Sequence, residues 1–319
     1  MCIGNEGLHS SEDPVESALN HPAGILADAA LIRLWNCKPK ANNGLPSPVR
    51  AYFDTITASR DGHLGRVMIM ARLHQLYSID PEWTEKHLLP LLTPTESKEA
   101  QDLWSGFAWS PTVGPNLLSA FKEIYLDAIA TYKGPEHRER NLVNLFISIC
   151  LDAPNQLTAH EIRRTVNSLP EEGLEASLRA LARRLTGNPC ERAEVWELKI
   201  RPWLEAYWPK AAVRNTSTTA NAMLGLLVEC GDAFPNAVTW SESYLQPIDG
   251  LGLYGLKKSD HVAHHPEAVF QVLKRVVQEQ SIKSWEKGTL REILDALKGA
   301  DPALGPDPAF QDMYRIATS

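Results

Sequence analysis

The segment His261-Val-Ala-His264-His265 holds the densest group of metal-capable side chains in the sequence, with acidic residues close by on both sides. On a single helix, His261 and His265 would lie one turn apart and could share a zinc ion. However, Pro266 predicts the start of a new helix, and the residue before a proline avoids helical geometry. No third ligand is evident elsewhere. We therefore expect a surface histidine cluster, with an all-helical metal-dependent hydrolase using His261, His264 and His265 as an alternative.

The stretch Gly250-Leu-Gly252-Leu-Tyr-Gly255 matches the glycine spacing of a dinucleotide-binding loop. Such a site needs a strand before the glycines, a helix after them and an acidic residue about 20 residues further on. The preceding segment contains Pro247 and has the character of a helix end, whereas Glu267, the acidic residue nearest that distance, is predicted to start a helix. We therefore expect a loop between two helices at this position.

Other catalytic signatures are incomplete. The pair His160-Glu161 begins like the zinc motif H-E-x-x-H, but Arg164 stands where the second histidine is needed. Glu161 is instead predicted to form a capping box with Thr158 at a helix start. Neither a G-x-S-x-G turn nor a Walker loop occurs. We therefore predict no catalytic residue, no metal ligand and no cofactor site, and we expect that the chain is not an enzyme.

Basic side chains gather at Arg163-Arg164 and again between Arg179 and Arg184, on two successive predicted helices. A solvated helix face explains such patches, and a docking site for an acidic partner or for nucleic acid is the alternative. The whole chain has 32 basic and 39 acidic residues and a net charge of −7, which is poorly suited to gripping a phosphate backbone. A nucleic-acid-binding helical module is therefore the less favoured hypothesis.

The elements that must position these residues are predicted to be helices. Apolar residues recur at helical spacing along almost the whole chain, without the alternation that is typical of half-buried strands. We predict an all-α protein of roughly a dozen or more helices, arranged as an irregular α-solenoid or HEAT-like array of antiparallel helix pairs. The clearest apolar stripes lie within residues 49–56, 64–71, 117–125, 142–149, 174–185, 223–230, 269–276 and 290–297.

Length and composition bound the domain organisation and the compartment. The chain has 319 residues, 44% of them hydrophobic, which is enough to bury a large core. We expect a flexible N-terminus at residues 1–17 and a single continuous helical domain at residues 18–319. Five cysteines without a C-x-x-C pair, no signal-peptide pattern and no apolar run of about 20 residues predict a cytoplasmic protein that does not span a membrane.

Nine tryptophans are many for a chain of this length. Trp196, Trp203 and Trp208 fall on one predicted helix, and Trp104 and Trp109 share a short segment. Aromatic residues at helical spacing predict mainly core positions. Any exposed minority would suit a partner surface, because tryptophan is enriched at the energetic centres of protein interfaces.

Short apolar and aromatic segments are spread over most of the chain: Ala18-Leu-Asn-His-Pro-Ala-Gly24, Trp83-Thr-Glu-Lys-His-Leu-Leu-Pro90, Leu103-Trp-Ser-Gly-Phe-Ala-Trp-Ser-Pro111, Tyr207-Trp-Pro-Lys210, Gly231-Asp-Ala-Phe-Pro-Asn-Ala-Val238 and Leu245-Gln-Pro-Ile248. Together they resemble a domain of unknown function found at the C-terminal end of long bacterial Sir2-like proteins. Those proteins are associated with anti-phage defence.

The resemblance implies a role but no chemistry. In that family the helical region follows a Sir2-like module that would cleave NAD, and the present sequence has no Rossmann pattern for such a module. No catalytic residue is therefore carried over. The resemblance implies an interaction or sensing region that regulates or scaffolds an effector, with a protein partner, a phage trigger or a second copy as its binding partner.

Overall fold

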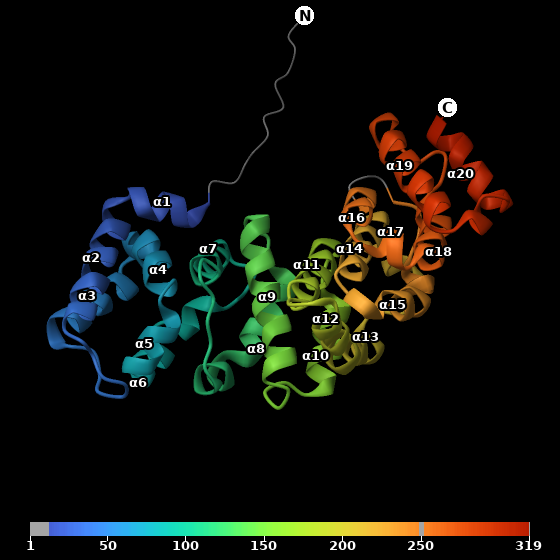
Figure 1. Cartoon of the computed structure of the whole chain (residues 1–319). Coiled ribbons are helices and arrows are strands. Elements are labelled where there is room, and N and C mark those ends of the chain that lie inside the picture. The colour runs from blue at the N-terminus through green and yellow to red at the C-terminus, as the bar shows by residue number, and fades with distance from the viewer. Residues whose placement is uncertain (1–12, 249–251, 319) are drawn as a thin grey trace, which may run out of the picture. The chain divides into compact units, whose positions relative to one another are not determined.

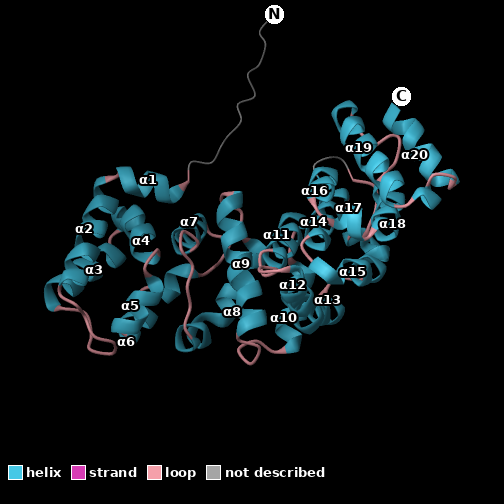
Figure 2. Ribbon diagram, viewed as in Figure 1, coloured by secondary structure: helices cyan, strands magenta, loops and turns pink. Residues whose placement is uncertain are grey.

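The computed structural model describes residues 13–248 and 252–318. These residues form helices joined by short connections, and no strand occurs among them (Figure 1 and Figure 2). The prediction of an all-α fold is therefore confirmed, whereas the solenoid arrangement stays a prediction. The chain divides into two compact units, Met1–Glu161 and Ile162–Ser319, and each is described by itself. A single continuous domain over residues 18–319 likewise stays a prediction.

The first unit begins with a helix that the sequence analysis placed inside the flexible N-terminus. Helix α1 starts at Pro14, so residues 14–17 of the predicted flexible segment are helical, and residues 1–12 lie outside the described part. The Asp13 side chain accepts a hydrogen bond from the Val15 N–H at 2.9 Å and caps the helix. The proline follows at the first helical position, where its missing N–H costs nothing.

The helices of the first unit are short to medium in length and follow one another closely. Their bounds are α1 (Pro14–Asn20), α2 (Pro22–Asn36), α3 (Ser47–Ala58), α4 (His63–Met70), α5 (Leu73–Ile79), α6 (Pro81–His87), α7 (Lys98–Phe107), α8 (Pro115–Thr131) and α9 (Glu136–Asp152). Helix α4 packs between α2 and α7, and α1 also contacts α4.

An aromatic cluster forms the core between α7 and α8. Trp104 and Phe107 contact Phe121 and Tyr125, with ring centroids about 6 Å apart, which is the range for favourable aromatic pairs. All four side chains are buried. The Tyr125 hydroxyl donates to the Leu142 carbonyl at 2.8 Å, which joins this cluster to α9. The stripe predicted within residues 117–125 is therefore a core stripe.

The second unit contains the remaining helices. Helix α10 (Ala159–Ser168) crosses the boundary, and it is followed by α11 (Glu171–Ala182), α12 (Pro189–Val195), α13 (Arg201–Tyr207), α14 (Ser217–Val228), α15 (Phe234–Ser241), α16 (Gly252–Lys258), α17 (His261–His264), α18 (Pro266–Val276), α19 (Ser284–Ala300) and α20 (Pro308–Thr318). Five residues from Trp196 to Ile200 form a π-helical turn that joins α12 to α13.

Helix α14 is the centre of the second unit. It packs against α11 on one side and against α15 and α16 on others, and α19 in turn covers α16 and α17. Helix α14 is apolar around most of its circumference, and a helix of this kind is expected to be enclosed. Its buried residues are Thr219, Ala220, Ala222, Met223, Leu224, Leu226 and Leu227.

The predicted helix starts agree with the structure where they were most specific. At α10, the Glu161 N–H donates to the Thr158 hydroxyl at 3.2 Å while the Glu161 carboxylate accepts from the Thr158 N–H at 2.6 Å, as a capping box requires. Asp80 caps α6 by accepting from the Trp83 N–H at 3.1 Å.

Within the described ranges, no helix combines the length and the apolar character needed to cross a membrane.

Candidate functional site

The histidine segment lies in the second unit, where it forms the short helix α17 and its end. His261 and His264 are the first and last residues of this helix, and His265 stands outside it with non-helical angles of φ −137° and ψ 53°. Pro266 then opens α18. The prediction that the proline would exclude His265 from the first helix is confirmed, and its physical basis is the clash between the proline ring and a preceding helical residue.

His261 is a core residue with a neutral ring. It is 8% exposed, and its ring stacks on Phe234 with centroids 4.0 Å apart and planes 7° apart. Its Nε2 lies 2.9 Å from the Val228 carbonyl oxygen, so Nε2 carries the proton and donates. Burial lowers the pKa of His261 by disfavouring the charged ring. The side chain thereby satisfies a carbonyl in the last turn of α14.

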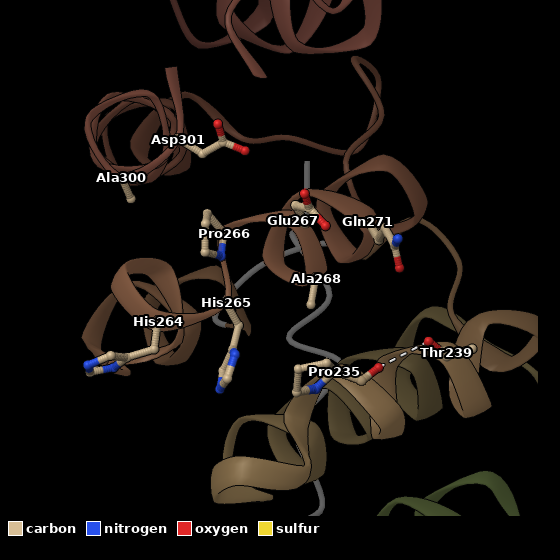
Figure 3. Close-up of a pocket in the computed structure, with 10 residues that line it drawn as sticks. All are labelled: Pro235, Thr239, His264, His265, Pro266, Glu267, Ala268, Gln271, Ala300 and Asp301. Atoms are coloured by element: carbon tan, nitrogen blue, oxygen red, sulfur yellow. Dashed lines mark hydrogen bonds between the residues drawn. The ribbon is translucent and has the colours of Figure 1, made fainter. Parts of the chain in front are cut away.

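The other two histidines do not complete a metal site with it. The His264 Nδ1 donates to the Asp260 carbonyl at 3.0 Å, and the rings of His264 and His265 point in different directions in the close-up (Figure 3). Their centroids are 6.5 Å apart. Across the described parts of the chain, no group of three or more histidine, cysteine or acidic side chains is placed to hold a metal ion. The zinc hydrolase alternative is therefore not carried forward.

Two cavities flank this segment and share His264 and His265. One has a volume of about 510 Å³ and lies between α15, α18 and the end of α19 (Figure 3). The Thr239 hydroxyl in its wall is not activated as a nucleophile, because it donates a hydrogen bond to the Pro235 carbonyl at 3.1 Å within α15. Asp301 caps the turn that follows α19 by accepting from a backbone N–H. The cavity contains no pair of nucleophile and base.

The other cavity has a volume of about 720 Å³ and carries charges of both signs. Arg192 pairs with Glu229 at 3.2 Å, and the Lys258 ammonium lies 4.6 Å from the centre of the Tyr254 ring. Because both cations have partners on the protein itself, the wall offers no concentrated positive charge to an anion. Neither cavity therefore provides a recognisable catalytic arrangement.

The glycine motif is partly helical. Gly252 begins α16 and Gly255 lies inside it, whereas Gly250 lies outside the described residues. The prediction of a loop is therefore wrong for residues 252–255. A side chain at Gly252 would approach the Asn221 side chain of α14 to 2.6 Å, so close packing of two helices accounts for this glycine. No strand precedes the motif in the described residues, as a dinucleotide site would require.

The arginine patch is largely engaged inside its own unit. The Arg163 guanidinium lies 3.4 Å from the Ala206 carbonyl and 5.9 Å from the centre of the Tyr207 ring. Arg179 pairs with Glu175 at 2.7 Å on the same helix. The remaining arginines of the patch, Arg164, Arg183 and Arg184, also have interaction partners. These contacts favour a structural role for the patch.

Glu161, the residue that resembles part of a zinc motif, serves the helix start. Burial alone would raise its pKa, but the Lys122 ammonium and the hydrogen bonds from Thr158 lower it to about 2. A carboxylate held so firmly in the ionised form is unsuited to act as a general base near neutral pH.

The tryptophans are mainly core residues as predicted, and the exposed ones are Trp109 at 37% and Trp285 at 56%.

One exposed apolar surface of the first unit was not predicted from the sequence. We define the α2 outer face as the five residues Pro22, Ile25, Leu26, Ala29 and Ile32, all of which are exposed. The three large side chains among them are more than half exposed, at 53% for Ile25, 57% for Leu26 and 53% for Ile32. The spacing of the five residues places them on one side of the helix.

The opposite side of α2 is also apolar, and it is buried. Gly24, Ala27, Leu31 and Leu34 face the rest of the first unit, where α2 packs on α1 and α4. A side chain at Gly24 would meet the Ala18 carbonyl at 1.9 Å, so this glycine permits the close contact with α1. Helix α2 is thus apolar on both sides but covered on only one, unlike α14, which is enclosed.

A signal for this face was present in the sequence. Between Pro22 and Asn36, only Asp28, Arg33 and the terminal Asn36 are polar, so the helix lacks the polar side of an ordinary surface helix. No family model matches the chain, and neither a curated protein nor a solved structure matches it significantly.

Proposed function

We propose that this chain is a non-catalytic helical interaction region and that the α2 outer face is a docking surface for another protein. The single observation that carries the proposal is the apolar, uncovered outer side of a helix whose inner side is fully packed. Contiguous exposed apolar patches on a protein surface are often sites of protein–protein interaction.

Burial of the α2 outer face on docking would contribute favourable free energy. Ile25, Leu26 and Ile32 each have about half of their surface left to bury. Burying a whole side chain of this kind contributes about 1.5–3 kcal/mol, so half of that from three residues comes to about 3 kcal/mol before the costs of association. Ala29, between them, leaves room for a second helix to approach closely.

The biological setting that we propose follows the resemblance to the helical domain of Sir2-like anti-phage proteins. In this setting the region regulates or scaffolds an effector, such as a Sir2-like NAD-cleaving module, in the cytoplasm. The partner is a protein, either the effector or a phage trigger, and nucleic acid is not the expected ligand. Support comes from the incomplete catalytic motifs, the engaged arginine patch and the α2 outer face.

The test combines a double variant with a matched control. We expect Ile25→Glu/Ile32→Glu to place two charges in the docking surface and to change NAD consumption during phage infection, measured in cells that carry the native locus. Leu198→Glu is the control, because Leu198 is 68% exposed and lies in the second unit. It is expected to behave as wild type.

Two outcomes would count against the proposal. If the double variant and the wild type give the same NAD levels and the same protection from phage, the α2 outer face is not the docking surface. If the purified chain alone consumes NAD, the region is catalytic, and residues 252–265 become the first positions to mutate.

A further inference from the structure

The α2 outer face is followed along the chain by a group of exposed cations. Arg33 lies in the last turn of α2, and Lys38 and Lys40 lie in the connection that follows. All three are exposed, and none of them makes an ion pair or a side-chain hydrogen bond within the described residues. The nearest acidic residue along the chain is the half-buried Asp28 of α2 itself, and the Asp80 carboxylate at the far end of the same connection is buried and pairs with Arg50 at 3.5 Å. Among the described residues the three cations therefore have no acidic partner, in a chain whose net charge is −7.

One of these cations occupies a position where lysine is not the natural choice. Lys38 has a φ of +49°, in the left-handed region that glycine and asparagine adopt most easily after a helix end. Its N–H donates to the Trp35 carbonyl at 2.9 Å and so closes the helix. A glycine would close α2 with less strain, so the backbone geometry does not account for the lysine.

We propose that the α2 outer face binds an amphipathic helix whose acidic end lies over Arg33, Lys38 and Lys40. This inference rests on the proposed function and adds the chemistry of the partner. The apolar stripe from Pro22 to Ile32 extends about 15 Å along the axis, at about 1.5 Å per residue, which matches about three turns of a second helix. Apolar residues at three- and four-residue spacing would cover it.

The charges also define the direction of the partner helix. Carboxylates are favoured in the first turn of a helix, where they interact with the positive end of its dipole. An antiparallel partner would place its first turn beside the C-terminal end of α2, next to the three cations. Acidic residues there would satisfy their own helix and the basic end of the face at once.

A second copy of this chain fits the face less well. In an antiparallel two-fold pair, the three cations would lie toward the α1–α2 junction of the other copy. The exposed residues there include one acidic side chain, Glu16, together with Asn20 and His21. One carboxylate cannot compensate three cations, so charge complementarity favours a different partner with more acidic residues.

The experiment uses two labelled peptides of about 18 residues, long enough to form helix on a surface. Both have leucine at helical spacing, and they differ only in their first turn, which has three glutamates in one and three lysines in the other. Binding to the full chain is measured by fluorescence anisotropy at low and high salt. We expect the glutamate peptide to bind at least tenfold more tightly than the lysine peptide, with an affinity that falls as salt rises.

Variants separate this inference from the proposed function. Lys38→Glu/Lys40→Glu is expected to weaken the glutamate peptide about tenfold and to strengthen the lysine peptide, while Ile25→Glu/Ile32→Glu abolishes binding of both and Leu198→Glu changes neither. Equal binding of the two peptides, lost only in the Ile25→Glu/Ile32→Glu variant, would overturn the acidic partner and leave the docking surface intact. Binding of neither peptide would overturn both.

Sedimentation of the same variants tests whether a second copy of the chain covers the α2 outer face. If the wild-type chain forms dimers that Ile25→Glu/Ile32→Glu dissociates, and the glutamate peptide does not compete, then a second copy covers the face. That result would overturn the inference, although the α2 outer face would still be an interaction surface.

Discussion

The two units of this chain are stabilised by different interactions. The first buries several charged side chains, Asp13, Arg66, Asp80, Asp102 and Arg138, whereas the buried polar groups described in the second are mainly hydroxyls, together with His261 and Glu286. In the first unit, ionic contacts join residues far apart in the sequence. In the second, ion pairs such as Arg192–Glu229 and Arg275–Glu242 also join distant helices, but their side chains are at least partly exposed, and the core contacts are mainly apolar. The two all-helical units therefore differ in how much buried charge contributes to their stability.

The charged contacts of the first unit join helices that are distant in the sequence. Asp13 accepts from the Arg138 guanidinium at 2.7 Å and from His137 at 3.1 Å, which joins the start of α1 to the start of α9. Arg66 donates to Glu99 at 2.8 Å and to the Ile56 carbonyl at 2.9 Å. The Asp13–Arg138 pair is buried on both sides, so breaking it is costly because one buried charge is left without its partner.

The largest expected effect is that of Arg66→Ala. Arg66 is 4% exposed and donates to the half-exposed Glu99 carboxylate and to two carbonyls, so its loss leaves the buried Ile56 carbonyl unpaired and also removes the packing of a buried side chain. We expect a loss of about 3 kcal/mol in the free energy of unfolding, measured by urea denaturation. Arg275→Ala, which removes the exposed pair with Glu242 in the second unit, is the control and should cost less than about 1 kcal/mol.

Hydrogen exchange would sharpen this prediction. The loss of protection in Arg66→Ala should begin in α3, α4 and α7, which the arginine joins. Equal destabilisation by Arg66→Ala and Arg275→Ala would mean that the buried charges do not distinguish the two units.

A smaller loss of stability is expected for substitution of His261, a buried side chain of the second unit. His261→Ala removes the stack on Phe234 and leaves the Val228 carbonyl without its donor, so we expect a loss of about 2 kcal/mol. His261→Phe keeps an aromatic ring and loses only the hydrogen bond, and it should cost about 1 kcal/mol. Thermal unfolding measures both. If His261→Phe is as damaging as His261→Ala, then the hydrogen bond, rather than the stack, stabilises this site.

We expect acid to destabilise the first unit before the second. Burial raises the pKa of Asp13, but hydrogen bonds from the Val15 N–H and the Arg138 guanidinium outweigh it, and the pKa lies below its ordinary value of 3.8. The pKa of Asp102 is lowered too, because contacts with His63 and Lys98 outweigh the effect of burial.

Since the folded pKa of each carboxyl lies below the unfolded one, its stabilisation is complete above pH 3.8 and is lost as the pH falls through the folded value. We expect the first unit to lose stability over this range before the second does, seen as earlier hydrogen exchange in α1, α4 and α7 than in α14. Asp102→Asn should remove part of this pH dependence. Simultaneous loss of protection in both units would contradict the comparison.

The smallest effect is expected within α2. Ile25→Ala alters an exposed side chain and should change the free energy of unfolding by less than about 0.5 kcal/mol, whereas Leu31→Ala, on the buried side of the same helix, should cost about 3 kcal/mol. Urea denaturation of the two variants measures the difference. A substantial loss in Ile25→Ala would show that the outer face is covered within the isolated chain.

Much of the local structure was predictable from the sequence. Helical periodicity, the Thr158 capping box and the helix break before Pro266 are set by interactions within a few residues, so the local sequence contains the required information. The buried positions of Trp104 and Trp196 followed from the same periodicity. The local pattern was misleading at Gly252 and Gly255, since glycine spacing alone does not reveal that α16 packs closely on α14.

The tertiary structure decided which surfaces meet. The pairing of Asp13 with Arg138 joins residues 125 positions apart, and no local pattern indicates it. The divergence of the His264 and His265 rings likewise depends on how α17 and α18 are placed. In α2, apolar residues lie on both sides of the helix, so the sequence leaves the covered side undetermined. Packing against α1 and α4 resolved that choice, because Gly24 allows close approach on one side only.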